Sequence, residues 1–536
     1  MAEARLQSLP WEGTPSQGAE VAAAGSPRLV TSSGRTPLVW SAPVGAGVAA
    51  SFPFSEAGQQ WQAWHLPCSS QAHEGPQDLF LSWSQGDEQG ELLQSGMVCR
   101  ADPQNPISDC LSVLIRRVVR AFQELAHGKA EHMLDHLANG VTRRNWRMVR
   151  EVWLEPELGE PRMSLIVRLA LDTKLHALLE SIAFAPRQVL ARVRQETRMD
   201  RVRELDAVCL RDYARRPGRT PVEKAGARQS LLAVQRLPNR DTLENRVTCW
   251  VLEALHTRGG EWSREHRSAA GSQRAQAVSR LVRRSATWRQ GECLSPVSAK
   301  ALHHPVQPNY PLQMDGRYRR IQELYRLLYR EKRVEDEAWT WRHVLWSQAA
   351  RQLLAGALVG VNHRDCNAPY FWHEQDRGQW LAPQSSPSPI DTAGSEAYWI
   401  DAADVQHYDW LKIAPRTWLK EIGRLGCECI LWWPDRDAVL VVWPILWTGG
   451  AVAPGSLVEG ASQAVQAFKK QHAPHVQIHG LILGSHAAST TQLDARKDVT
   501  AVYMPMSFDQ GDEAAFRALC KDLRAAIQLA IEASHG

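Results

Sequence analysis

The clearest pattern of hydrophobic positions lies in residues 426–485. Three short runs there (CECILWW, AVLVVWPILW and VQIHGLILGS) are rich in Val, Ile, Leu and Trp and bounded by Pro, Gly and Asp, as is typical of buried strands. Between the second and third runs, apolar residues recur one, three and four positions apart, as on an amphipathic helix. These helix positions are Leu457, Val458, Ala461, Val465 and Phe468. The pattern predicts a strand hairpin, a helix and a returning strand, the centre of a small α/β sheet.

The rest of the pattern predicts a multidomain α+β protein. The predicted parts are a mobile N-terminus at 1–35, a small β-rich domain at 36–100, a helical, arginine-rich domain at 101–300 and an α/β domain at 301–536. The first is rich in Ala, Gly, Ser and Pro, and the second has short alternating runs between turn residues. In the third, Ser108 is the expected N-cap of a first helix, and helical periodicity is expected from about Lys129 to Ala286.

The amino-acid composition restricts the classes of protein to which this chain can belong. A chain of 536 residues holds two to four domains, and its net charge of +4 excludes a global polycation. Any nucleic-acid surface must therefore come from local clustering of charge. The ten cysteines form no CxxC pair, and His303 and His304 have no Cys or acid cluster beside them, so we expect free thiols and no metal. No signal peptide or membrane-length apolar run is present, which predicts a cytoplasmic protein without membrane contact.

A first arginine-dense stretch covers roughly residues 187–220. Its acids fall within pairing distance of many arginines along a predicted helix. These acids are Glu196, Asp200, Glu204, Asp206 and Asp212. The stretch is therefore either a solvated, salt-bridged face or a phosphate-contacting face. Arg215, Arg216 and Arg219 favour the second reading because few acids lie near them and a guanidinium can bind phosphate through two hydrogen bonds.

Two further arginine runs are candidates for DNA contact. The run SQRAQAVSRLVRRSATWRQG contains no acid, an imbalance that favours a nucleic-acid partner. The run VTRRNWRMVR is similar. The candidates in these two runs are Arg280, Arg283, Arg284, Arg143, Arg144 and Arg147.

The segment RLPNRDTLENR has the pattern of a helix start. Pro238 is expected to end the preceding element, and Asp241 or Thr242 can cap a new helix whose first turn Glu244 or Asn245 completes. The expected buried face consists of Val247, Trp250, Val251, Ala254 and Leu255.

This segment, together with GRYRRIQELYRLLY and WTWRHVLW, resembles a bacterial family of McrC-like proteins over roughly residues 100–480. The R-D-T-x-E-N-R motif of that family corresponds here to Arg240, Asp241, Thr242, Glu244, Asn245 and Arg246. The resemblance implies a β-rich N-terminal region, an arginine-bearing helical region and a C-terminal restriction-endonuclease-like domain of the PD-(D/E)XK type. It also implies a partnership with McrB-type AAA+ NTPases in phage restriction.

The nuclease site that the resemblance implies is incomplete. Active relatives end one strand in an acid and carry acid-x-Lys on the next, which together hold Mg²⁺ and a water. Asp435 corresponds to the first acid, but the second strand offers Trp443, Pro444 and Trp447. On the following helix, Gln463 and Gln466 fall where relatives often carry glutamine. Migrated acids could come from Glu428, Asp437, Glu323 or Glu459, but Lys469 and Lys470 lie one helix away.

We therefore expect no catalytic residues and no metal, and predict a DNA-binding, non-catalytic subunit of a bacterial antiphage defence complex. Its partner would be an AAA+ or helicase-type NTPase, because the chain has no GxxxxGK[ST] loop with which to act as the motor. One alternative is a Mg²⁺-dependent DNA endonuclease with a rearranged site around Asp435, Glu428, Asp437 and Gln463. The other is a scaffold subunit that binds only protein.

Overall fold

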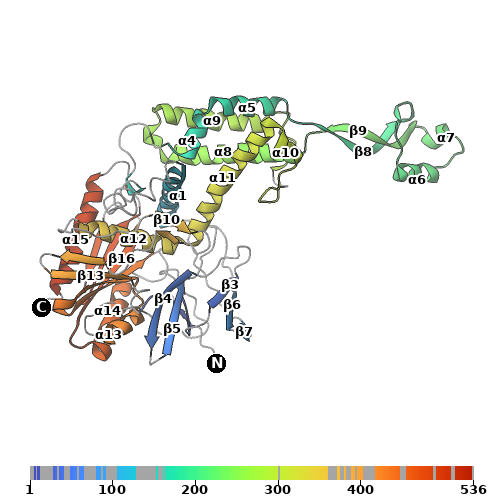
Figure 1. Cartoon of the computed structure of the whole chain (residues 1–536). Coiled ribbons are helices and arrows are strands. Elements are labelled where there is room, and N and C mark those ends of the chain that lie inside the picture. The colour runs from blue at the N-terminus through green and yellow to red at the C-terminus, as the bar shows by residue number, and fades with distance from the viewer. Residues whose placement is uncertain are drawn as a thin grey trace. The chain divides into compact units, whose positions relative to one another are not determined.

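The computed structural model describes residues 5–7, 9–11, 28–32, 36–40, 49–56, 59–65, 80–85, 88–91, 106–127, 152–154, 161, 163–299, 302–359, 371–374, 379–381, 388–392, 395–401, 417–446, 454–486, 491–506, 508 and 513–533 (Figure 1). The chain is an α+β protein that divides into two compact units. Unit 1 comprises Met1–Leu158 and Lys332–Gly536, and unit 2 comprises Gly159–Glu331.

A seven-stranded mixed sheet forms the centre of unit 1, in the order β12-β13-β14-β15-β16-β18-β17. The strands are β12 Ser388–Thr392, β13 Ser395–Asp401, β14 Cys429–Trp433, β15 Ala438–Ile445, β16 Gln477–His486, β17 Gln492–Ala495 and β18 Val499–Pro505. The pairs from β12 to β15 are antiparallel, β15, β16 and β18 are parallel, and β17 is an antiparallel edge. The central strands are apolar throughout because both faces of the sheet are covered.

Helices cover this sheet on both faces. α14 (Pro454–His472) packs on one face, and its predicted apolar stripe is buried there. On the other face, α1 (Pro106–His127), α12 (Arg342–Val359) and α15 (Glu513–Ala533) contribute to a second core. The predicted order of hairpin, helix and returning strand is confirmed. The predicted N-cap at Ser108 is wrong, because α1 already begins at Pro106, where the fixed φ of proline suits the first helical position.

Strands also occupy the N-terminal part of unit 1. A four-stranded sheet contains β1 (Arg5–Gln7), β2 (Arg28–Ser32), β5 (Gln59–His65) and β4 (Ala49–Glu56), in that order. A three-stranded sheet contains β3 (Thr36–Trp40), β6 (Phe80–Gln85) and β7 (Glu88–Glu91), and β10 (Phe371–Glu374) pairs with β11 (Gln379–Leu381). The expectation of a wholly mobile stretch at 1–35 is wrong, because β2 pairs with β5 over five residues and Arg28 is buried against Glu428.

Unit 2 is a helical bundle from which a long two-stranded arm extends (Figure 1). The helices are α4 Leu165–Leu171, α5 Thr173–Phe184, α8 Leu243–Glu265, α9 Gln273–Gln290, α10 Tyr310–Met314 and α11 Gly316–Thr340, whose part up to Glu331 belongs to this unit. The arm (residues 189–239) consists of β8 (Val189–Arg198), the turn η1 (Met199–Arg201), α6 (Ala207–Arg215), α7 (Pro221–Ala225) and β9 (Ser230–Asn239).

The arm corrects the prediction of continuous helix from Lys129 to Ala286. β8 and β9 pair in an unbroken antiparallel register, from Val189 opposite Asn239 to Arg198 opposite Ser230. β8 carries a β-branched residue at every fourth position, and such residues favour the extended backbone. The arginines and acids in this stretch recur at spacings that would let them pair along a helix, and this charge pattern led to the prediction of a helix. Pro238 does not end an element but lies within β9, near the end of a two-stranded ribbon where a missing donor is tolerated.

The two units do not follow the predicted boundaries near residues 100 and 300. Residues 302–328 contribute Leu302, Val306, Leu312 and Tyr318 to the core of unit 2, whereas α1 packs in the core of unit 1. The first and last parts of the chain therefore form one unit, and unit 2 is inserted between them.

Candidate functional site

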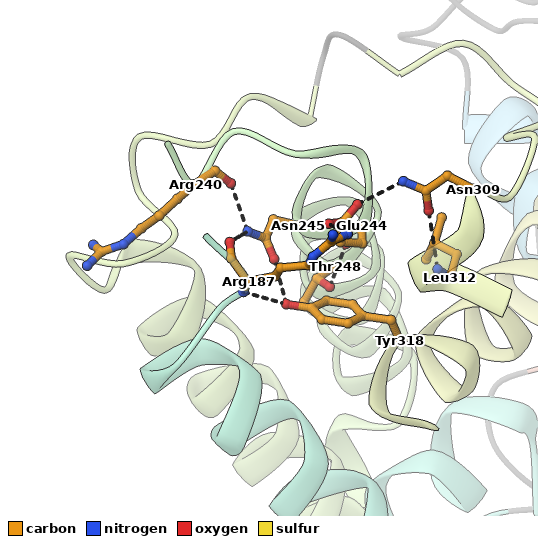
Figure 2. Close-up of polar contacts among 8 residues, drawn as sticks. All are labelled: Arg187, Arg240, Glu244, Asn245, Thr248, Asn309, Leu312 and Tyr318. Atoms are coloured by element: carbon orange, nitrogen blue, oxygen red, sulfur yellow. Dashed lines mark hydrogen bonds and ion pairs between the residues drawn. The ribbon is translucent and has the colours of Figure 1, made fainter. Parts of the chain in front are cut away.

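The base of the arm is held by one buried carboxamide. Asn245, in the first turn of α8, is fully buried. Its Nδ2 donates at 2.8 Å to the carbonyl oxygen of Arg187, which lies just before β8, and at 2.8 Å to that of Arg240, which follows β9 (Figure 2). A single side chain thus connects both ends of the arm to the helical bundle.

Tyr318 completes this connection from α11. Its hydroxyl donates to Oδ1 of Asn245 and accepts from the backbone N–H of Arg187, both at 2.8 Å (Figure 2). Burial raises the pKa of Tyr318 above its ordinary value, so the hydroxyl keeps the proton that it donates. Asn245 therefore has all three of its hydrogen bonds filled by fixed groups.

Glu244 adds a charged contact beside Asn245. It is almost fully buried, and its carboxylate accepts from Nη1 of Arg187 at 2.7 Å and from Nδ2 of Asn309 at 3.0 Å (Figure 2). Burial alone would raise the pKa of Glu244, but the hydrogen bonds from Asn309 and Arg187 outweigh it and lower that pKa. Asn309 in turn caps α10 by accepting from the N–H of Leu312. We call Arg187, Glu244, Asn245, Asn309 and Tyr318 the latch.

The outer residues of the R-D-T-x-E-N-R segment lie beside the latch. Arg246 donates from Nε and Nη2 to the two carboxylate oxygens of Asp241, each at 2.7 Å, and this bidentate contact lowers the pKa of Asp241. The predicted start of α8 is confirmed, because Thr242 occupies the N-cap position, but its side chain makes no capping hydrogen bond to the helix. Three latch residues, Arg187, Asn309 and Tyr318, were missed as partners of the motif because they lie 57 to 73 positions away from their partners.

Along the arm, the acids are paired with arginines. All five acids that the sequence placed within pairing reach do pair, mostly across the hairpin rather than along a helix. The pairs are Glu204 with Arg192 and Arg236, Asp206 with Arg194, Asp200 with Arg198, and both Glu196 and Asp212 with Arg216. A two-stranded hairpin is marginal by itself in water, and these pairs, together with the packing of α6 on β9, support it.

Arg216 therefore differs from its two predicted companions. Two carboxylates hold it, its Nη1 also donates to the carbonyl of Ser230 at 2.8 Å, and hydrogen bonding to Asp212 raises its pKa. The sequence-based expectation of few acids near Arg216 is wrong. Arg215 and Arg219, by contrast, are exposed.

The far end of the arm (residues 199–229, here the tip) carries exposed arginines without a carboxylate partner. In the described part of the chain no acidic oxygen lies within ion-pair distance of any of them. They are Arg201, Arg203, Arg211, Arg215, Arg219 and Arg228. The arm contains twelve basic and six acidic residues, a net charge of +6, although the whole chain is only +4. Positive charge is therefore concentrated on this element.

The bundle presents a second group of predicted arginines. Arg280, Arg283 and Arg284 are exposed on α9, opposite its buried face, and among the described residues none of them pairs with an acid. Nη1 of Arg284 lies 3.4 Å from Nδ1 of His176, and burial is the main cause that lowers the pKa of His176. Arg143, Arg144 and Arg147 lie outside the described residues.

In unit 1, the structure does not bring the predicted nuclease acids together. Asp435 is exposed in the turn η6 (Pro434–Arg436), and Glu428 is paired with the buried Arg28. Asp437 has a left-handed backbone (φ 48°), and Gln463 is exposed on α14. Of the other candidates, Glu323 pairs with Arg320 in unit 2, and Glu459 is exposed on α14. Among the described residues, no group of three His, Cys, Asp or Glu side chains could hold a metal ion.

A tryptophan fills the strand position where an acid-x-Lys would lie. Trp443 is fully buried in β15, and its Nε1 donates to the carbonyl of Leu425 at 2.8 Å. Its ring meets the edge of Trp11, with the centroids 5.1 Å apart. Gly480 on β16 leaves room for it, because a Cβ there would lie 2.4 Å from the indole. These residues do not fit Mg²⁺. Trp447 lies outside the described residues.

An acid that the sequence analysis missed lies near two residues that it named. Asp498, directly before β18, accepts from Nε2 of Gln466 at 2.8 Å, and Nζ of Lys469 lies 3.8 Å from its other oxygen. His479 and Thr500 are buried nearby and share a hydrogen bond of 2.9 Å. With a single carboxylate, this cluster is a polar packing contact between α14 and the sheet.

Residues 162–294 match the model of a domain of unknown function, DUF2357, a segment that contains the arm, α8 and α9 but not Asn309 or Tyr318. No curated protein matches the chain. A solved structure, a refined half-complex from a tetradecameric assembly of Thermococcus gammatolerans McrB AAA+ hexamers with bound McrC, is similar over 88% of this chain and 85% of that chain, at 10% identity and a TM-score of 0.21. That TM-score does not establish a common fold.

In the described part of the chain, no helix is both long enough and apolar enough to pass through a bilayer.

Proposed function

We propose that this protein is a non-catalytic, DNA-binding subunit of a bacterial antiphage defence complex and that the tip of its arm contacts DNA phosphates. The observation that carries the proposal is the set of six exposed tip arginines without acidic partners. An unpaired guanidinium offers its planar donors to a phosphate without first breaking an ion pair. The paired arginines along the ribbon would contribute little, since their charge is already neutralised by carboxylates.

Two further features support this role. The latch fixes both ends of the arm, so that less conformational freedom is lost when the arm binds. The exposed α9 arginines offer additional phosphate contacts on the same unit. Phosphate contacts carry no sequence information, so binding should show weak sequence preference and strong dependence on salt.

On this proposal, a separate AAA+ or helicase-type NTPase is the motor of the complex. The chain contains no phosphate-binding loop of the GxxxxGK[ST] type, and the R-D-T-x-E-N-R segment resembles proteins that act beside such motors. The proposed part of this chain is to bind DNA, and the partner would supply the work of NTP hydrolysis.

Duplex DNA retention across a salt series tests the proposal. Replacing Arg211, Arg215 and Arg219 with Ala should weaken binding by roughly tenfold or more and make the salt slope shallower by about two to three, because each lost phosphate contact removes about 0.9 from that slope. The matched control replaces Lys470, Arg496 and Lys497, three exposed cations of unit 1, and should change retention less than about twofold. Affinity that ignores salt between about 50 and 200 mM would contradict DNA binding.

The ion pairs along the arm favour a second candidate function, that of a scaffold that binds only protein. Five acids of the arm already neutralise arginines, as expected of a solvated face. On that reading, charge reversal at Arg283 and Arg284 leaves DNA retention unchanged because none exists in the wild type. The same retention assay therefore separates the two candidates.

A further inference from the structure

Four aromatic rings of unit 2 form one contiguous cluster that reaches the surface. They belong to Trp250 of α8, His304 of the loop before α10, and Tyr325 and Tyr329 of α11, and the centroids of contacting rings lie 4.9 to 5.8 Å apart. The rings of His304, Tyr325 and Tyr329 are nearly parallel, with interplanar angles of 11 to 13°. Tyr325 is buried, but Trp250 and Tyr329 are half-buried and His304 is exposed. Ring surface of this group, here the ring cluster, is therefore open to solvent.

Hydrogen bonds fix the exposed member of the ring cluster. The hydroxyl of Tyr325 accepts from the backbone N–H of Val306 at 3.1 Å and lies 2.8 Å from Nδ1 of His304. Burial raises the pKa of Tyr325 above its ordinary value, so the hydroxyl keeps a proton that it can donate to Nδ1. The ring of His304 is thus held in position before any ligand arrives, which lowers the entropic cost of stacking a flat group on the cluster.

Two exposed arginines flank the ring cluster on α11. An α-helix turns about 100° per residue, so Arg326 and Arg330 lie roughly 60° and 100° around the helix axis from Tyr329, on the same side. Of the positions three and four residues from either arginine, only Glu323 is acidic, and it pairs with Arg320. In the described part of the chain, no carboxylate lies within ion-pair distance of Arg326 or Arg330. Both guanidinium groups can therefore bind an anion beside the rings.

We propose that the ring cluster, together with Arg326 and Arg330, binds single-stranded nucleic acid. An unpaired base stacks on the exposed rings, and the phosphates next to that base contact the two arginines. Proteins bind single strands through this combination of aromatic faces and cations, because every base has a π-face and every nucleotide carries a negative phosphate. A duplex would offer its phosphates to the arginines, but its bases are stacked on one another and present no face to the rings.

This site is distinct from the tip of the arm. The tip arginines are proposed to contact the phosphates of a duplex, whereas the ring cluster requires bases that are unpaired. The inference rests on the proposed function only in naming nucleic acid as the ligand, and duplex contact at the tip can fail without affecting it. Stacking and phosphate contact do not distinguish ribose from deoxyribose, so both kinds of strand enter the experiment.

Fluorescence anisotropy of the full chain with labelled oligothymidylate and oligouridylate tests the proposal. A comparison strand has the same length and charge but carries abasic sites in place of bases. The wild type should bind a strand with bases at least about fivefold more tightly than the abasic strand. His304→Ala combined with Tyr329→Leu should remove most of that preference, because the base then loses its stacking surface. Arg326→Ala combined with Arg330→Ala should keep the preference but make the salt slope shallower by about 1.4, since each phosphate contact on a single strand contributes about 0.7.

The matched control replaces an exposed histidine and an exposed tyrosine of unit 2 that lie outside the ring cluster. His256→Ala combined with Tyr310→Leu should keep both the preference for bases and the salt slope. Circular dichroism checks that each variant is folded. Light-induced crosslinking of strands that carry iodouracil adds a readout on the wild type, in which attachment should map to Trp250, His304 or Tyr329.

A preference for bases with only one of the two sugars would assign the site to that kind of strand. Equal affinity for the abasic strand, a preference that survives in the ring variant, attachment only elsewhere on the chain, or competition by duplex as strong as by single strand would each overturn the proposal. Duplex retention should fall in the tip variant and not in the ring variant, which keeps this result separate from the tip.

Discussion

At the scale of single residues, unit 2 depends on polar groups that are buried and satisfied. Asn245 is fully buried, and its side chain bonds to the residues that flank the arm, Arg187 and Arg240, and to Tyr318 of α11. A buried polar group left without a partner destabilises a protein by about 1–3 kcal/mol, more than a made hydrogen bond contributes. We therefore expect Asn245 to be the main contact that holds the base of the arm against the bundle.

Replacing Asn245 with Leu tests this. The change leaves the carbonyl of Arg187 and the hydroxyl of Tyr318 without the partner that Asn245 supplies, while the carbonyl of Arg240 keeps only the N–H of Thr242. We therefore expect a loss of about 2–4 kcal/mol and faster exchange of the amides at both ends of the arm. Native-state hydrogen exchange measures both. Gln195→Leu is the control, because the side chain of Gln195 bonds to the side chain of Gln235 across the ribbon, and the change should cost less than about 1 kcal/mol. Equal protection of the arm ends in both variants would show that Asn245 is not the connection.

His479 gives unit 1 a dependence on pH. Burial is the main cause that lowers its pKa to about 4, from 6.5 in the unfolded chain. Because the unfolded state binds the proton first, the stability due to neutral His479 is fully present above pH 6.5 and is lost as the pH falls towards 4. The loss should approach roughly 3 kcal/mol.

Urea unfolding between pH 7 and 4 measures this dependence. In the His479→Gln variant, the free energy of unfolding should fall less steeply between pH 7 and 4 than in the wild type. This holds whatever the variant's stability at pH 7. The exposed His475 gives the control, since His475→Gln should keep the wild-type slope. A slope that is the same in all three proteins would assign the pH dependence to other groups.

At the scale of elements, the sequence was informative where one local pattern determines the structure. The runs that became β14, β15 and β16 are apolar on both faces, so their burial could be read directly. The ribbon of β8 and β9 was read as helix because arginines interrupt its alternation, and pairing between strands about 30 to 50 positions apart is not visible in a local window. For the same reason the motif residues could be found, but not their partners Tyr318 and Asn309.

The arm should be separable from the bundle. Ala191 lies opposite Leu237, so residues 192–236 can be replaced by an Asn-Gly turn that suits a two-residue hairpin. The latch and the core of unit 2 remain, and we expect the melting temperature of this unit to change little while duplex retention falls at least as far as in the tip variant. Differential scanning calorimetry and the salt series measure the two effects. Loss of the bundle's folding would mean that the arm contributes to its core.

At the scale of the whole molecule, catalysis would need groups from several elements to converge. Metal-dependent hydrolysis of DNA needs carboxylates around one ion and a group that orients the water. Here the hairpin, helix and returning strand are present, but Arg28 neutralises Glu428, Asp435 lies exposed in a turn, and Trp443 occupies the position on β15 where the acid-x-Lys would lie. The missing acid-x-Lys could be recognised in the sequence, but the contacts of the N-terminal Arg28 with Glu428 and of Trp11 with Trp443 could not.

Incubation with phage DNA and Mg²⁺ or Mn²⁺, with and without its NTPase partner, should therefore give no cleavage attributable to this chain. Asp435→Ala should behave as the wild type, because among the described residues no group of three His, Cys, Asp or Glu side chains could hold a divalent ion there. Arg28→Gln is the informative companion. It releases Glu428 and should lower stability, since a buried carboxylate then lacks its counter-charge, without creating cleavage. Scission that Asp435→Ala abolishes would instead require acids to converge on a metal ion, and would make this chain a nuclease with a rearranged site.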